Sequence, residues 1–312
     1  MTPESRGLIA VDWGTTSLRA ARLDAGGRVL EEMSLPRGIL TIPAGEFAHF
    51  FESAFAPWMG TPGALCLISG MAGSKQGWVE APYCPCPAGF DEVAANLKWI
   101  EAEAGFIRTA IVPGLSCELA HAADVMRGEE VQILGAMQLS GMQDGRFVLP
   151  GTHSKWALVE GARVVSFRTF MTGEIYALLS QHSILAKTIQ ADAPLDEIAF
   201  AQGVKLAQRE NGLLHTAFSA RTLSLFSRMS APALASYLSG LVIGDELRLQ
   251  ALDAGSEVVL IGSNALTARY TLALTLLGVR SQALGSEATW AGLHALAGAV
   301  GGLEEPAKTR RG

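Results

Sequence analysis

The first part of the chain alternates short apolar runs with polar breaks, a pattern typical of β-strands. Apolar runs over residues 8–13, 17–23 and 28–34 are separated by short turns, and the last two are joined by "DAGG", a hairpin signal. The pattern therefore predicts a three-stranded β-meander at the start of the chain.

Beyond this meander, the apolar spacing changes to that of helices and short buried strands. Helices are expected over "GEFAHFFESAFAPW" and over residues 90–105, where Gly105 would end the second helix. Strands are expected at "ALCLISG" and "TAIVPG". "RGEEVQILGAMQL" is expected to form a helix with its carboxylates in the first turn, where the helix dipole favours negative charge. This order of elements indicates an α/β fold.

The same pattern restarts near residue 145. "GRFVLPGTHSKWALVEGARVVSFRTFM" predicts a second meander, which is followed by long helices, the strands "EVVLIGS" and "VRSQAL", and two further helices. Two copies of a meander followed by α/β elements predict two related domains that pack across a cleft. We place them at residues 1–140 and 141–312, with a last helix at about 286–300 packing at the interface between the domains.

Composition and charge narrow the class of partner. The chain has 312 residues, of which 49% are hydrophobic, so it can bury a sizeable core. A net charge of −6 argues against nucleic-acid or anionic-membrane binding, since both need clustered Lys and Arg. No apolar stretch approaches the roughly 20 residues of a membrane span, and "MTPESRG" is unlike a signal peptide. We expect a cytoplasmic protein with a small polar ligand.

The first meander contains a turn with two open interpretations. Gly14 allows close backbone approach, and the hydroxyls of Thr15, Thr16 and Ser17 with successive N–H groups could wrap phosphate oxygens. Asp12, at the end of the strand, could hold Mg²⁺ through water. An ordinary hairpin is the alternative on shape alone.

A second hairpin of similar composition favours the phosphate interpretation. "LPGTHSKW" again places Gly151 and Thr152 in a strand-turn-strand segment, now with His153 and Lys155. Lysine is a good point charge for a terminal phosphate. Two such hairpins facing one another across a cleft would form a clamp.

Two further glycine-bearing segments are candidates for ligand contacts. In "LIGSNALTARY", Gly262 and Ser263 lead into a helix, where small residues leave room for adenine, although helix capping is the simpler explanation. The segment Ser69–Trp78 follows a strand and indicates a binding loop, with an ordinary surface loop as the alternative.

Charged residues at two helix starts are candidates for chemistry. In "MRGEEVQ", Glu129 or Glu130 could accept a proton from a hydroxyl while Arg127 meets an anion; the alternative is a favourable first turn on a solvated helix. In "FRTFMTGE", Thr172 either caps a helix or, with Arg168, contacts a ligand.

Taken in order, these segments resemble a known group of proteins. "DWGTTSLRA", "VMRGEEVQILGA", "PGTHSKW" and "IGSNALTARY" resemble the sugar kinase, actin and chaperone-ATPase superfamily. Together with "SGMAGSKQGW", "FRTFMTGE" and "YLSGLVIG", they are similar to the 2-dehydro-3-deoxygalactonokinase family, over residues from about 8 to 295.

The resemblance implies two ribonuclease-H-like domains, with mixed sheets flanked by helices around a central cleft that holds ATP and Mg²⁺. It also implies transfer of the γ-phosphoryl group to the 6-hydroxyl of 2-dehydro-3-deoxygalactonate, in the breakdown of sugar acids. The alternatives are a kinase for another sugar acid, such as 2-dehydro-3-deoxygluconate, and a non-catalytic ATP-switched protein of the same superfamily. A homodimer is left open.

The resemblance also implies roles for individual residues. Asp12 would organise the metal, and largely alone, because Pro150 stands where much of the superfamily has an Asp. Glu130 is the expected base, with Glu129 as the second candidate. Phosphate and ATP contacts are expected from Gly14, Thr15, Thr16, Ser17, Arg19, Gly151, Thr152, His153, Lys155, Gly262, Ser263 and Asn264. Substrate contacts are expected from Ser74, Lys75, Gln76, Trp78 and Arg127.

Overall fold

The computed structural model describes residues 7–59, 64–101, 107–120, 122–190, 192–209 and 212–301. The chain divides into two compact units. The first unit comprises residues 1–144, 157–167 and 286–312, and the second comprises residues 145–156 and 168–285.

A six-stranded mixed sheet forms the centre of the first unit. Its order is β3 (Val29–Leu35), β2 (Leu18–Leu23), β1 (Leu8–Trp13), β4 (Leu65–Gly70), β7 (Arg108–Ile111) and β6 (Lys98–Trp99). The antiparallel β1–β2–β3 meander is confirmed, and β4 and β7 run parallel to β1. Asp12 lies opposite Ser69 in this register, so the carboxyl ends of β1 and β4 lie side by side.

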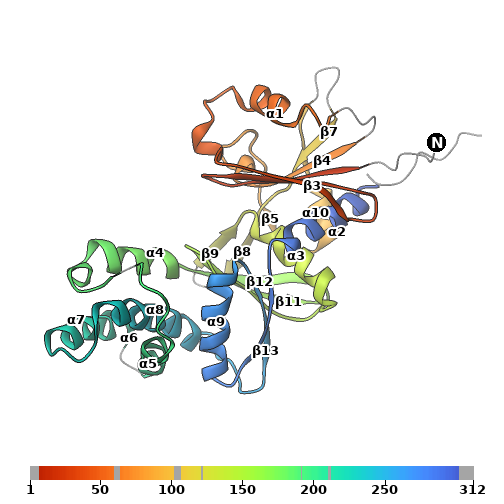
Figure 1. Cartoon of the computed structure of the whole chain (residues 1–312). Helices are drawn as coiled ribbons and strands as arrows, with labels where there is room; N and C mark the ends of the chain where they lie inside the picture. The colour runs from red at the N-terminus through yellow and green to blue at the C-terminus, as the bar shows by residue number, and fades with distance from the viewer. Residues whose placement is uncertain are drawn as a thin grey trace, which may run out of the picture. The chain divides into compact units, whose positions relative to one another are not determined.

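Helices cover both faces of this sheet (Figure 1). On one face, α1 (Phe47–Phe55) buries three phenylalanines against the core around Trp13. The predicted helix over 45–58 is thereby confirmed, as its apolar spacing required. On the other face lie α3 (Glu129–Ser140) and α10 (Glu287–Ala299).

Glycines allow α3 and α10 to pack closely. A Cβ atom on Gly135 would lie 1.8 Å from the Ala288 carbonyl oxygen, and one on Gly292 would lie 2.0 Å from the Val131 carbonyl oxygen. This packing groups residues 286–301 with the first unit, whereas our sequence boundary assigned them to the C-terminal domain.

The predicted helix over residues 90–105 is wrong in its length. The helix α2 (Phe90–Ala95) stops because the Asn96 side chain donates to the Glu92 carbonyl, and Lys98–Trp99 then pair as a strand. Gly105, the predicted end, lies outside the described residues. The sequence pattern also missed a small sheet of β5 (Cys84–Pro85), β8 (Leu115–Leu119) and β9 (Ala122–Met126), which leads directly into α3.

A five-stranded sheet carries the second meander, which is confirmed. Its order is β12 (Arg163–Phe170), β11 (Ser154–Glu160), β10 (Gly145–Leu149), β13 (Glu257–Ile261) and β14 (Arg280–Leu284), with β13 and β14 parallel to β10. The predicted helices appear as α5 (Glu197–Ala207), α8 (Ala231–Arg248) and α9 (Asn264–Leu276). They bury Phe200, Ile243 and Leu274 against this sheet.

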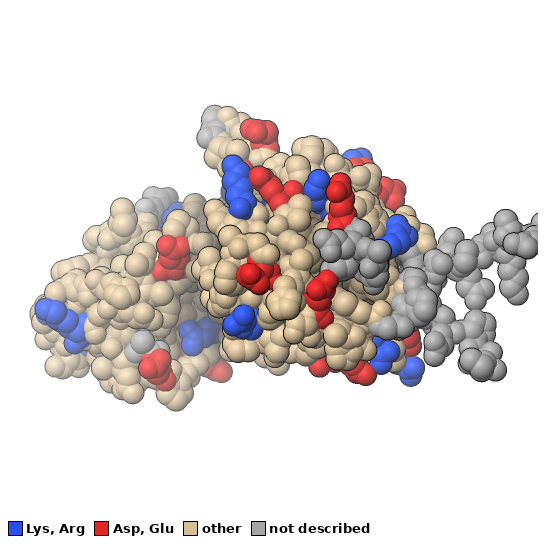
Figure 2. All heavy atoms as spheres, turned by 90° about the horizontal axis from the view of Figure 1, so that it is seen from above, with Lys and Arg blue, Asp and Glu red and all other residues tan. Residues whose placement is uncertain are grey.

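Short helices complete the second unit. They are α4 (Thr172–Ala177), η3 (Leu178–His182), η4 (Ile184–Lys187), α6 (Gly212–Thr216) and α7 (Phe218–Leu225). Among the described residues, every helix is too short or too polar to pass through a membrane. On the face drawn in Figure 2, basic and acidic side chains are interspersed.

Candidate active site

The turn between β1 and β2 presents hydroxyl groups to solvent. The Gly14 N–H donates to the Ser17 carbonyl at 2.9 Å, while Thr15, Thr16 and Ser17 are exposed. Below them, Arg19 donates to the Asp12 carboxylate at 2.5 Å, and the Asp12 side chain is 17% exposed. The turn has the composition and exposure that a phosphate cradle requires.

A neighbouring segment, residues 37–41, holds this turn in place. The backbone N–H groups of Ile39 and Leu40 in η1 (Ile39–Thr41) donate to the carbonyls of Gly14 and Thr15. A Cβ atom on Gly38 would lie 2.2 Å from the Thr15 carbonyl oxygen, so only glycine fits here. The conformation of the turn therefore depends on a segment that sequence analysis did not connect with it.

The acidic start of α3 folds back on its own backbone. Gly128, with φ +105°, lets β9 turn sharply into the helix. The Arg127 N–H donates to Glu129 Oε2 at 2.9 Å, and the Gly128 N–H donates to Glu130 Oε2 at 2.7 Å. Both carboxylates thereby satisfy donors at the start of the helix.

Glu130 differs from Glu129 in its surroundings. Its side chain is fully buried, and Oε1 has no hydrogen-bond partner. Burial, and secondarily the charge of Glu129, raise the pKa of the Glu130 carboxyl to about 8. The alternative of a solvated helix start is therefore wrong for Glu130.

Glycines bring this helix start against the carboxyl ends of β1 and β4. A Cβ atom on Gly128 would lie 3.3 Å from the Cα of Gly70. A Cβ atom on Gly70, where φ is +89°, would lie 2.8 Å from the Trp13 carbonyl oxygen and 3.3 Å from Asp12 Oδ1. The structure thus places the predicted metal residue and the predicted base on adjoining segments of one unit.

Arg127 reaches into the loop that follows β4. Its Nη2 donates to the Ala81 carbonyl at 2.8 Å, and its guanidinium lies 4.4 Å from the centre of the Tyr83 ring. A Cβ atom on Gly73, in η2 (Met71–Gly73), would lie 2.8 Å from Arg127 Nη1. Tyr83 is a contact that sequence analysis missed, because nothing in the local pattern links it to Arg127.

Unpartnered polar atoms are concentrated at this place. Of the six buried side-chain polar atoms that lack a partner in the described part of the chain, four belong to Ser74, Arg127 and Glu130. They are Ser74 Oγ, Arg127 Nε and Nη1, and Glu130 Oε1. Buried polar groups are normally paired, so such a concentration is typical of a site that a polar ligand completes.

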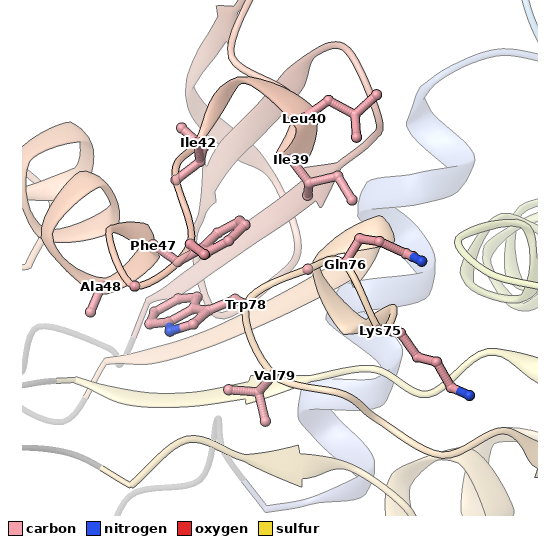
Figure 3. Close-up of a pocket in the computed structure, with 12 residues that line it drawn as sticks. Ile39, Leu40, Ile42, Phe47, Ala48, Lys75, Gln76, Trp78 and Val79 are labelled. Atoms are coloured by element: carbon pink, nitrogen blue, oxygen red, sulfur yellow. The ribbon is translucent and has the colours of Figure 1, made fainter.

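The other predicted substrate residues lie along the same loop. Lys75, Gln76 and Trp78 line a cavity of about 600 Å³, together with Gly77, Val79 and residues of the 39–48 segment. Figure 3 shows Lys75 and Gln76 extending away from Trp78. The centre of the Trp78 ring lies 5.1 Å from that of the Phe51 ring. Trp78 therefore packs against the core of the first unit and also lines the cavity.

In the second unit, the β10–β11 hairpin is supported by α4. The Glu174 N–H donates to the Thr152 carbonyl, and the Glu174 carboxylate lies 2.6 Å from His153 Nε2. A Cβ atom on Gly173 would lie 2.5 Å from the Gly151 carbonyl oxygen. Lys155 is only 6% exposed, and its ammonium donates to Thr169 Oγ1 at 2.8 Å.

Of the two interpretations of Thr172, a helix cap or a ligand contact, the helix cap is wrong. Thr172 is the first residue of α4 and its hydroxyl makes no capping bond; instead it donates to Glu246, a buried carboxylate in α8. Arg168 donates to the Gln250 side chain at 3.0 Å.

A cavity of about 140 Å³ adjoins the second hairpin. Its walls include Gly151, Gly173, Tyr176, Leu266 and Arg269. The predicted adenosine residues, Gly262, Ser263 and Asn264, lie at the start of α9. This helix also contributes to the cavity wall, from Leu266 onward, two residues after Asn264.

Comparison with known proteins shows the family. The family model described as 2-keto-3-deoxy-galactonokinase matches residues 12–296. A relative named as a 2-dehydro-3-deoxygalactonokinase from Rhizobium meliloti (strain 1021) is 37% identical over 298 residues, covering 93% of this chain and 96% of the relative. The 2-dehydro-3-deoxygalactonokinase of Escherichia coli (strain K12) is 30% identical over 295 residues, covering 94% and 98%.

A solved structure agrees with these sequence matches. The crystal structure of a protein described as a 2-dehydro-3-deoxygalactonokinase from Sinorhizobium meliloti has a TM-score of 0.84 at 34% identity, covering 95% of this chain and 99% of the other. The sequence and structural matches extend over nearly the whole chain. The chain therefore belongs to the 2-keto-3-deoxy-galactonokinase family.

Proposed function

We propose that this chain transfers the γ-phosphoryl group of ATP to the 6-hydroxyl of 2-dehydro-3-deoxy-D-galactonate, giving the 6-phosphate and ADP. The observation that carries the proposal is the set of four buried, unpartnered polar atoms on Ser74, Arg127 and Glu130. A sugar acid offers partners for these atoms. Its carboxylate or keto oxygens can accept from the Arg127 N–H groups, and its hydroxyl can donate to the Glu130 carboxylate.

Arg127 suits the anionic end of the substrate. Its Nε and Nη1 are N–H donors without partners, and hydrogen bonds from a guanidinium to a carboxylate are charge-assisted and strong. The Nη2 contact with Ala81 and the Tyr83 ring hold the guanidinium in a fixed orientation, which reduces the entropy lost on binding. Ser74 and the loop through Trp78 would contact the remaining polar groups.

Glu130 suits the role of general base. As the 6-hydroxyl oxygen attacks the γ-phosphorus and ADP leaves, the hydroxyl proton would pass to Oε1, the oxygen that has no partner. Its Oε2 stays bound to the Gly128 N–H, which fixes the carboxylate in position. Phosphoryl transfer depends mainly on alignment and charge neutralisation, which a fixed carboxylate favours.

The donor set at the first hairpin fits a magnesium ion. Mg²⁺ in kinases is held by one or two carboxylates together with water and substrate phosphates, and Asp12 offers a partly exposed carboxylate beside three hydroxyl residues. When bound, the ion would neutralise phosphate charge. Arg19 keeps the Asp12 carboxylate oriented through Oδ2.

The second unit would bind the nucleotide. Gly151, Thr152 and His153 present an exposed turn for phosphate oxygens, and the adjoining cavity has walls from Leu266 and Arg269 that suit a nucleoside. Gly262, Ser263 and Asn264 would flank the adenosine from the start of α9.

Coupled measurement of ADP release tests the function. With ATP and Mg²⁺ but no sugar acid, the chain should release ADP only slowly. Addition of 2-dehydro-3-deoxygalactonate should make ADP release much faster. The gluconate-derived epimer, offered at the same concentration, should be a poorer substrate. Nucleotide binding without acid-dependent ADP release would contradict the kinase proposal and support an ATP-switched protein.

A further inference from the structure

The second unit contains a buried carboxylate that is not among the residues to which the proposed function gives a role. Glu246 in α8 is 3% exposed. Its Oε1 accepts from Trp156 Nε1 at 2.6 Å, and its Oε2 accepts from Tyr270 Oη at 2.8 Å and from the Thr172 hydroxyl. One side chain therefore accepts hydrogen bonds from β11, α9 and α4.

Each of these three donors belongs to an element that contacts the second hairpin. Trp156 follows the hairpin directly along β11. Tyr270 Oη lies 2.9 Å from Ser154 Oγ, the residue at which the hairpin enters β11. Thr172 precedes Gly173, whose missing side chain allows α4 to lie against Gly151. Through these three donors, Glu246 links the turn between β10 and β11 to α4, the helix that supports the turn.

The same donors border the cavity beside the hairpin. Thr172 and Tyr270 both line it, together with Gly151 and Arg269. A change in how Glu246 holds these two side chains would therefore alter the turn and the cavity at once. The exposed first hairpin, Arg127 and Glu130 belong to the other unit.

Stability alone does not explain an acid at this position. Removing a carboxylate from water is energetically costly, and an apolar side chain of similar volume often stabilises a core at least as well. Burial raises the pKa of Glu246, and the three donors oppose that rise by favouring the charged form. Unlike an apolar residue, the carboxylate makes directional hydrogen bonds, and these orient three donors from three different elements.

We propose that Glu246 is a positioning residue for nucleotide binding: it fixes the Gly151–Ser154 turn and the adjoining cavity in the arrangement that receives the phosphates and nucleoside of ATP. The identity of the ligand rests on the proposed function. The positioning claim itself concerns the affinity of this unit for an adenine nucleotide.

The test compares a substitution of Glu246 with one of an adjacent acid outside its hydrogen-bond network. The Kd for ADP is measured by titration calorimetry, and the KM for ATP and for the sugar acid by steady-state kinetics. Glu246→Gln replaces one accepting oxygen by an NH2 group, so either Trp156 Nε1 loses its acceptor or the Tyr270 and Thr172 hydroxyls must turn to accept instead of donating. We expect the Kd for ADP and the KM for ATP to rise about tenfold. The KM for the sugar acid should stay within about twofold of the wild-type value. Asp245→Asn is the matched control, because Asp245 is the adjacent acid on α8 and pairs with Arg248 outside the network of Glu246.

A second pair of substitutions keeps the test decisive if Glu246→Gln does not fold. Thr172→Val removes one donor at nearly constant volume and should weaken ADP binding, while Thr172→Ser retains the hydroxyl and should restore it. If Thr172→Val or Glu246→Gln lowers the melting temperature but binds ADP as the wild type does, Glu246 is only a structural residue and the proposal is wrong. Failure of the kinase proposal would show differently, as a wild-type chain that binds ADP and phosphorylates no sugar acid.

Discussion

The carboxylate of Glu130 accepts a 2.7 Å hydrogen bond from the N–H of Gly128 through Oε2, and its Oε1 is buried without a partner. In the proposed mechanism the two oxygens have different roles, because Oε2 orients the side chain and Oε1 would take up the hydroxyl proton. Glu129, one residue earlier, uses its Oε2 to accept from the Arg127 N–H.

Glu130→Gln should lower kcat by about 10²–10⁴-fold, because an amide cannot take up the hydroxyl proton. The Kd for ADP should be unchanged. Steady-state kinetics with saturating ATP check the first expectation, and Glu129→Gln is the matched control. A large loss of kcat in Glu129→Gln with normal turnover in Glu130→Gln would move the base to Glu129.

The pH dependence of catalysis should follow the same carboxyl group. A general base must be deprotonated, and the pKa of Glu130 is raised to about 8, so kcat/KM should rise with pH up to about 8 and then level off. Initial rates measured from pH 6 to 9 at constant ionic strength check this. A profile that is flat over this interval would exclude Glu130 as the titrating base.

Stability should depend on pH in the opposite sense. The pKa of Glu130 is about 8 in the folded chain against 4.5 for an ordinary glutamate, so between these values the unfolded chain releases a proton that the folded chain keeps. The free energy of unfolding should therefore fall as pH rises from about 4.5 to about 8. Glu130→Gln does not titrate, and by pH 8 it should be more stable than the wild type by about 2–5 kcal/mol. Urea unfolding at pH 5 and pH 8 measures this difference; equal stability at both values would contradict the burial of a titrating group.

Arg127→Lys should raise the KM for the sugar acid about tenfold or more with little change in the KM for ATP, because lysine keeps the charge but lacks the fixed, planar arrangement of guanidinium N–H donors. Arg163→Lys is the matched control: Arg163 also donates to a backbone carbonyl, that of Pro87, but pairs with Glu92 at an exposed position. Equal effects of the two substitutions on the KM for the acid would mean that Arg127 does not contact the substrate.

Gly38→Ala should disturb the first phosphate turn. Its φ of −75° suits any residue, so the effect is steric: the new Cβ would meet the backbone of Thr15 and Thr16 at 2.2 Å. We expect a loss of about 1–3 kcal/mol in stability together with a raised KM for ATP. Gly298→Ala, where a Cβ meets nothing within 4 Å, should leave both unchanged. Wild-type kinetics in Gly38→Ala would show that the turn does not depend on the 37–41 segment.

The sequence predicted elements whose signal is local. The apolar runs of β1 and β4, the "DAGG" turn and the acidic first turn of α3 each carry their evidence within a few residues, and all are confirmed. The helix expected over residues 90–105 failed because apolar spacing continued past Asn96, where a side-chain bond to the Glu92 carbonyl ends α2.

Features that depend on distant residues could not be predicted. Glu246 is separated from Trp156, Thr172 and Tyr270 by 90, 74 and 24 residues, so its network has no local signature beyond a single acid in an apolar helix. Likewise, Gly70 and Gly128 lie against one another but are 58 residues apart in the sequence, and only the fold brings them together. The roles of Asp12, Lys155 and Gly262–Asn264 stay predictions.

The most direct test of the proposed phosphoryl transfer is phosphorus NMR of the reaction of the purified chain with ATP, Mg²⁺ and 2-dehydro-3-deoxygalactonate. The γ-phosphate resonance should be replaced by that of a phosphomonoester coupled to the protons of carbon 6, in equal amount with ADP. Inorganic phosphate formed at the same rate with and without the acid, or ATP that stays intact, would contradict it.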